Sequence, residues 1–245
     1  RSGPNKSFVF LAGDVIYKGP YKRDDKRFTN IIARSLIFES WETPCVIKAL
    51  GYCETPDGLF IRFPNIMGEI EDTEIYEEPF SKLRYKVAKS LPVNEVLKVL
   101  PKNSWIFNYA EDLIVALCHA YILGVGDTNL TNCLVDIRRK LLYMVDFDDN
   151  RRTTGDGPMF YFSKCPAKVH GWAERVRGHY NQIRDRIMTL RDNRLVLSYG
   201  LSDKLEETIE KIKKYTQDTP LNIVGQKISG PINPGLVSIY PHSTK

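Results

Sequence analysis

The sequence lacks the features that mark membrane-spanning, secreted and metal-cluster proteins. No apolar run approaches the ~18 residues that a transmembrane helix needs. The 5 cysteines are an odd number, and they form no CxxC or Cys/His group with metal-ligand spacing. Residues 1–6 are polar, and no apolar signal core follows them. We therefore expect reduced thiols and an intracellular location, either cytoplasmic or nuclear.

A strong charge of either sign is also missing. The chain has 35 basic and 30 acidic residues, which gives a net charge of +5. This excess fits an anionic ligand such as a nucleotide or a phospholipid head, but a solvated basic surface is the simpler interpretation, and no nucleic-acid partner is evident. A hydrophobic content of 42% in 245 residues suits one large domain or two closely packed lobes.

The first third of the chain is predicted to form a small sheet with one helix. Apolar and β-branched runs predict strands, Gly and Asp mark the turns, and Asp24 or Asp25 is a helix N-cap. The predicted elements are two strands within 8–18 with a turn at Gly13-Asp14, a helix over 25–41, strands over 46–52 and 59–63, and a turn over 55–58.

The rest of the chain is predicted to be mainly helical. Its longest apolar helix ends at Gly124, a natural C-cap, and carries His119, which we interpret as a core histidine. The predicted elements are helices over 105–123, 167–190 and 203–215, two strands over 133–136 and 141–147, and an extended tail rich in Pro, Gly and Asn from 218 onward.

Residues 121–152 contain the most informative motif. Asp127 follows Gly-Val-Gly, Asn132 comes five positions later, and the second predicted strand ends in Asp146-Phe147-Asp148. Phosphoryl transfer needs metal-held phosphates and an oriented hydroxyl, and carboxylate and amide oxygens are suitable Mg²⁺ ligands. The alternative is a loop of Asx turns followed by a charged surface turn. Turn chemistry alone does not predict Asp146 at the end of an apolar strand.

These motifs resemble the phosphatidylinositol kinase-like superfamily of atypical kinases. In that family a long helix leads into Gly-Asp-Arg-His-x-x-Asn and later into Asp-Phe-Gly, and the Asp-Phe-Asp form is similar to the metal motif of aminoglycoside phosphotransferases. The resemblance covers residues from about 8 to 42 and from 104 to 152. It implies an α+β, two-lobed protein-kinase-like fold with an N-lobe over 1–67, a helical C-lobe over 68–217, a tail over 218–245, and ATP between the lobes.

The resemblance also implies roles for the motif residues. Asp127 would accept the proton of the acceptor hydroxyl, while Asn132, Asp146 and Asp148 would hold Mg²⁺ or Mn²⁺. Two positions depart from the family pattern: Asn129 replaces the His, and Asp148 replaces the Gly of Asp-Phe-Gly. Asn cannot act as a general base.

The nucleotide-binding lysine is predicted at Lys18. Its strand precedes the first helix, as in the superfamily, whereas Lys48, in a Val-Ile-Lys run, follows that helix. Glu39 falls on an apolar helical face with Phe28, Ile32 and Leu36, so we expect it to be buried and paired with Lys18. Asp24 or Asp25 can share that role, because the lipid-kinase pattern has an acidic residue near the start of this helix.

The adenine pocket is predicted to use Ile16, Ile47 or Phe63, with a hinge over 63–67. No GxGxxG loop is present to cover the phosphates, and Gly13-Asp14 is the candidate hairpin in its place. The phosphatidylinositol kinases likewise lack a glycine-rich loop of that form.

The expected function is ATP- and Mg-dependent phosphotransfer to a hydroxyl. A protein Ser or Thr is favoured as acceptor over a phosphoinositide, because the chain has no room for the large helical and membrane-binding domains that usually accompany lipid kinases. A small-molecule hydroxyl is a third option. The rival from another class is a pseudokinase that acts as a nucleotide-binding or scaffolding module. Asn129 and Asp148 favour it, and the residues that oppose it are Lys18, Asp127, Asn132 and Asp146.

Overall fold

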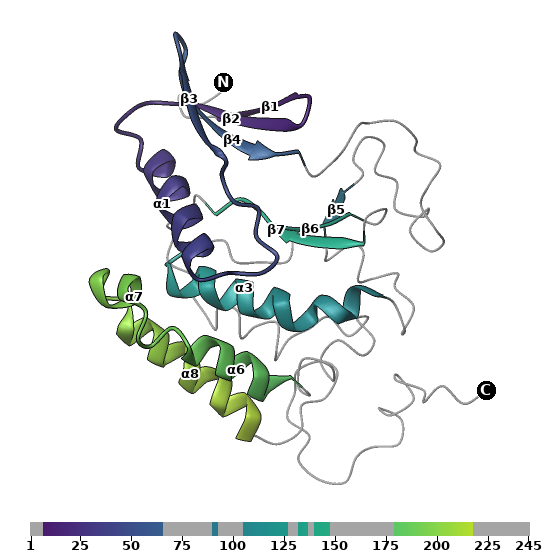
Figure 1. Ribbon diagram of the computed structural model, residues 1–245, viewed down its shortest axis with the longest axis vertical. Coiled ribbons are helices and arrows are strands. Elements are labelled where there is room, and N and C mark those ends of the chain that lie inside the picture. Colours follow the sequence, from purple (N-terminus) through teal and green to yellow (C-terminus); the bar gives the residue numbers. More distant parts are fainter. Residues whose placement is uncertain are drawn as a thin grey trace, which may run out of the picture.

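The computed structural model describes an α+β protein built from two sheets and a group of helices (Figure 1). The first part is a four-stranded sheet with one helix beside it, and the second is a three-stranded sheet with a long helix and three further helices below it. The described residues are 7–65, 90–92, 105–126, 132–136, 140–147 and 179–217. The predicted lobe boundary near 67 and the predicted tail over 218–245 lie outside these ranges.

The four-stranded sheet is antiparallel throughout and has the order β1-β2-β4-β3. Two predicted turns are confirmed: Gly13, with φ +57°, joins the first two strands, and Gly58, with φ +134°, follows the turn between the last two. A Cβ on Gly58 would lie 2.8 Å from the carbonyl oxygen of Tyr21, so this position excludes larger residues. The strands are β1 (Phe8–Ala12), β2 (Val15–Tyr21), β3 (Gly51–Thr55) and β4 (Gly58–Pro64).

The helix α1 (Lys26–Ser40) begins where the sequence predicts, but it buries a different face. The Asp25 side chain caps it by accepting a hydrogen bond of 2.9 Å from the Arg27 amide. The predicted face is right in part, since Phe28 and Ile32 pack against the core. It is wrong at its other end, because Leu36 is 62% exposed and Glu39 is also exposed, so the buried face is rotated from the predicted one. The buried residues are Ile31, Arg34, Ser35, Ile37 and Phe38.

Polar partners explain this rotation. Ser35 Oγ accepts a hydrogen bond of 3.1 Å from the Ala49 amide, and Arg34 donates to backbone carbonyls of other segments. A polar side chain can be buried when its hydrogen bonds are made. The spacing of apolar residues along a helix carries no information about hydrogen-bond partners that are distant in sequence. Apolar spacing alone therefore predicts the wrong face for Glu39.

The segment after α1 crosses from one sheet to the other. It was predicted as a strand over 46–52, but the strand of the first sheet begins only at Gly51. Before that, the Ile47 amide donates to the Met144 carbonyl at 3.1 Å, and the Met144 amide donates to the Cys45 carbonyl at 2.5 Å. Val46 and Met144 form a parallel bridge. These residues therefore attach to the edge of the second sheet.

The second sheet is also antiparallel and has the order β5-β6-β7. The first predicted strand of its hairpin is confirmed, and the second ends at Met144 rather than at 147. Asp146 has φ +60°, which is incompatible with a continuing strand. The strands are β5 (Ser90–Pro92), β6 (Cys133–Asp136) and β7 (Leu141–Met144).

The helices that follow the first sheet and α1 lie on the far side of the second sheet from the first (Figure 1). The predicted long helix begins with a 3₁₀ segment and ends before Gly124, whose φ of +69° confirms the predicted cap. Within the described residues no helix has the length and apolar composition to cross a bilayer. The helices are η2 (Trp105–Tyr109), α3 (Ala110–Ile122), α6 (Tyr180–Met188), α7 (Arg194–Ser198), which was not predicted, and α8 (Ser202–Gln217).

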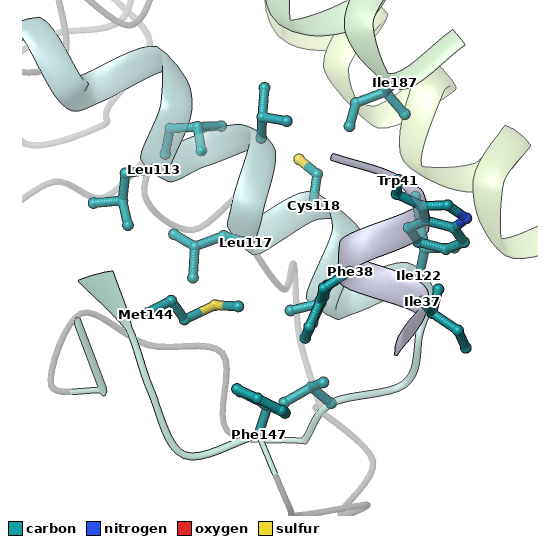
Figure 2. Close-up of a cluster of buried hydrophobic side chains, with 14 of the residues drawn as sticks. Ile37, Phe38, Trp41, Leu113, Leu117, Cys118, Ile122, Met144, Phe147 and Ile187 are labelled. Atoms are coloured by element: carbon teal, nitrogen blue, oxygen red, sulfur yellow. The ribbon is translucent and has the colours of Figure 1, made fainter. Parts of the chain in front are cut away.

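One hydrophobic core joins α1, α3 and the end of β7 (Figure 2). Phe38 of α1 lies against Phe147 in an edge-to-face contact, with ring centroids 5.2 Å apart. Leu117 of α3 and Met144 of β7 belong to the same core. The packing of α1 is therefore tied to the segment that follows β7.

His119 is buried in this region, as the sequence predicts. It is 3% exposed, its Nδ1 lies 2.8 Å from Thr43 Oγ1, and its ring meets Trp41 edge-to-face. Burial, with a smaller contribution from Arg186, lowers the pKa of His119 to about 3. The imidazole is therefore neutral in the folded protein.

Mildly acidic pH should destabilise the protein through His119. Because the folded-state pKa is below the unfolded value of about 6.5, this contribution is intact above pH 6.5 and is lost as the pH falls toward 3; at pH 5 the loss is up to about 2 kcal/mol. Denaturant unfolding measures the free energy of unfolding at pH 7 and at pH 5. The difference between these two values should be smaller in His119→Gln than in wild type. Thr43→Val keeps the imidazole and should keep the wild-type difference. Equal pH dependence in wild type and His119→Gln would contradict this account.

Candidate functional site

A cleft of about 300 Å³ lies between the first sheet and the β6–β7 hairpin. All but two of the residues that line it are apolar, and the exceptions are Lys18 and Asp146. An apolar cavity with a few convergent polar groups is the usual form of a small-molecule site. The other lining residues are Val9, Ile16, Ile31, Ile47, Phe63, Pro64, Leu134, Val145 and Phe147.

The pleat of the first sheet directs β2 toward the cleft. Ile16 and Lys18 are two residues apart and therefore share a face. Phe63 is the cross-strand partner of Ile16, and Val9 is the partner of Lys18, so these residues belong to the same face. The structure thus brings together Ile16, Phe63 and the crossover residue Ile47, from which the sequence predicts the adenine contact. Adenine binding itself stays a prediction.

Lys18 and Asp146 form an ion pair across the cleft. The Nζ atom of Lys18 lies 2.6 Å from Oδ1 of Asp146, and their side chains are 16% and 51% exposed. Lys18 comes from the first sheet and Asp146 from the segment that follows the second. Lys48 is not among the lining residues.

Asp146 has an unusual backbone conformation. Its φ of +60° lies in the left-handed region, which Asp and Asn tolerate better than most residues. The residues on either side are held: the Val145 amide donates to the Asn132 carbonyl at 2.8 Å, and the Phe147 carbonyl accepts from Arg34 at 2.5 Å. Backbone strain of this kind clusters at functional sites.

Asn132 lies at the same end of the hairpin as Asp146. It directly precedes β6, and its carbonyl bonds Val145, the residue before Asp146. An amide and a carboxylate at one strand end are suitable oxygen ligands for Mg²⁺. Within the described ranges no three His, Cys, Asp or Glu side chains are grouped so that they could hold a metal ion. The other predicted members of this constellation, Asp127, Asn129 and Asp148, lie outside those ranges.

The acidic residues predicted to assist Lys18 lie elsewhere. Glu39 and Asp24 are exposed, and Asp25 caps α1 and pairs with Arg27 at 2.7 Å. The hydrogen bond from Arg27 lowers the pKa of Asp25. None of these three carboxylates is among the residues that line the cleft. The predicted burial of Glu39 is wrong, and the carboxylate beside Lys18 is that of Asp146.

Sequence reasoning missed two contributions from α1. Ile31 is a lining residue, and Arg34, one turn further along the same buried face, bonds the Phe147 carbonyl. A signal was available: Ile31, Arg34, Ser35 and Phe38 recur at helical spacing, with polar residues in the middle of the stripe. Polar residues inside an apolar stripe indicate a face with specific partners.

The sequence matches no protein-family model and no curated protein. The chain's function must therefore be inferred from the chemistry of this cleft and from the motifs around it.

Proposed function

We propose that this protein is an ATP- and Mg²⁺-dependent phosphotransferase with a two-lobed, protein-kinase-like fold. The observation that carries the proposal is the apolar cleft between two sheets, with Lys18 and Asp146 facing each other across it. The order of elements supports it too: a lysine-bearing strand, a helix and two more strands precede a long helix and a hairpin, and Asp146 follows that hairpin.

The residues of the cleft suit the parts of a metal-bound nucleotide. The apolar side chains of Ile16, Ile47 and Phe63 suit a purine ring. Lys18 supplies a positive charge for the phosphates, and Asp146 and Asn132 supply oxygens for the metal. Asp146 and Asn132 would hold the metal, which would supply positive charge beside the phosphates, and Lys18 would pair with the phosphates in place of Asp146.

The proposed chemistry is transfer of the γ-phosphate to a hydroxyl. Asp127 accepts the hydroxyl proton and orients the oxygen for in-line attack, while the metal neutralises charge on the phosphates. A protein Ser or Thr is the acceptor that we test first. Phosphoinositides and small-molecule hydroxyls are the alternative acceptors.

Lys18→Met should weaken ATP binding by about 10- to 100-fold, the worth of one charge-assisted hydrogen bond. The fold should be retained, because an ion pair with a half-exposed partner contributes little to stability. Lys48→Met is the matched control and should bind ATP like wild type. Isothermal titration calorimetry measures both affinities. If Lys48→Met loses ATP and Lys18→Met does not, the wrong lysine has been assigned.

Asp146→Asn should remove the metal-dependent part of ATP binding. Asparagine also tolerates φ +60°, so the backbone is kept while the charge is lost. In wild type, Mg²⁺–ATP at a hundredfold excess over Kd should raise the free energy of unfolding by about 2.7 kcal/mol, which corresponds to a rise in Tm of roughly 5–10 °C. Thermal unfolding with ATP, with and without Mg²⁺, measures this rise. The control variant Asp185→Asn changes an exposed carboxylate and should keep the metal-dependent rise in Tm. A full metal-dependent rise in Asp146→Asn would exclude Asp146 from the site.

The transfer reaction itself is tested with γ-labelled ATP and Mg²⁺ or Mn²⁺. The acceptors are the protein alone, a generic protein substrate, phosphoinositide vesicles and small-molecule hydroxyl compounds. Asp127→Asn should lower transfer by about 10²–10⁴-fold, because it removes general-base assistance, and should leave metal–ATP affinity near wild type. Wild-type protein that binds metal–ATP but transfers phosphate to none of these acceptors and not to water would instead be a nucleotide-binding module.

A further inference from the structure

The buried face of α1 carries a cation. Arg34 is 6% exposed and lies on the same face as Ile31, at 1%, and Phe38, at 0%. A buried charge is costly unless it is hydrogen-bonded. The position of α1 therefore depends on the groups that bond this guanidinium.

Those groups include three backbone carbonyls from two separate segments. Nη1 of Arg34 donates to the Phe147 carbonyl at 2.5 Å, and Nη2 donates to the carbonyls of Gly124 at 3.1 Å and Leu123 at 3.5 Å. Leu123 and Gly124 end α3, where the helix dipole favours a positive charge. One side chain thus joins α1, the end of α3 and the segment after β7.

The bond to Phe147 lies next to the proposed metal ligand. Phe147 directly follows Asp146, and its ring is held by Phe38 at a centroid distance of 5.2 Å (Figure 2). Ile31 and Phe147 both line the cleft. Since Val145 is also held on the other side, the left-handed backbone of Asp146 is fixed at both ends.

We propose that Arg34 is a positioning residue that sets the Asp146 carboxylate for metal binding by fixing the Phe147 carbonyl against the end of α3. This inference rests on the proposed function and deepens it. It gives α1 a link to the site through a guanidinium and backbone carbonyls, whereas the sequence predicted a link through Glu39. The planar guanidinium has five N–H donors in a fixed fork, and a lysine ammonium cannot reach all three carbonyls in the same way.

The first test measures Mn²⁺ affinity in the presence of saturating ATP, by electron paramagnetic resonance. Arg34→Lys should weaken Mn²⁺ binding by about 10- to 100-fold, as removal of an outer-shell partner does, and should leave metal-free ATP binding unchanged. Arg34→Met should show the same loss and avoids burying an ammonium group. Arg191→Lys changes an exposed Arg–Glu pair and should have no effect. Wild-type Mn²⁺ affinity in both Arg34 variants would overturn the proposal.

The second test does not depend on nucleotide or metal. The amides of Val125 and Val145 are hydrogen-bonded to Ala120 and Asn132, and they report on the two segments that Arg34 joins. Hydrogen exchange at both should quicken in Arg34→Lys and Arg34→Met. The control variant Ile209→Val removes a methyl group from a buried residue of α8 and lowers stability away from the two segments. It should not selectively quicken exchange at the Val125 and Val145 amides. Faster exchange at one segment only, or at neither, would overturn the link. Wild-type protein that binds no metal–ATP would overturn the proposed function, while the exchange result would still decide whether Arg34 couples the segments.

Discussion

A guanidinium that is removed from water must find acceptors, and in this protein that requirement organises the region around the cleft. Arg34 finds carbonyls at the end of α3 and at Phe147. Meeting them turns α1 so that Ile31 enters the cleft and Phe38 reaches Phe147. The same rotation leaves Leu36 and Glu39 in solvent. The hydrogen bonds of one buried charge thus act with the apolar contacts of Ile31 and Phe38 to fix which face of α1 is buried.

The cleft combines three structural features within a small volume. Its walls are apolar and come from both sheets, its two charges face each other, and the carboxylate stands on a left-handed backbone. Each of these is ordinary alone. Their convergence at the end of the β6–β7 hairpin is the observation on which the proposed nucleotide site rests.

Local patterns in the sequence predicted most elements, because strands, turns and helix caps depend on neighbouring residues. The alternation in β2 also brought Ile16 and Lys18 to one face, and Gly58 and Gly124 marked real turns. The buried face of α1 left only one local signal, the polar residues inside an apolar stripe, and the partners of those polar residues could not be predicted in this way. Its polar members are satisfied by Ala49, Gly124 and Phe147, which are distant in sequence. The strand predicted from 46 failed for a similar reason, because Ile47 pairs with Met144 of the other sheet.

The crossover that joins Cys45 and Ile47 to Met144 has a mechanical consequence. It is a seam that hydrogen-bonds the segment leading into β3 to the edge of the second sheet, and Ile47 of this segment lines the cleft. A seam of this kind resists separation more than rotation, because rotation can leave its bonds intact. Relative movement of the two sheets should therefore pivot at this seam. Ile47 and Val145 would then keep a nearly constant spacing, while Val9, at the far edge of the sheet, would sweep through the largest arc.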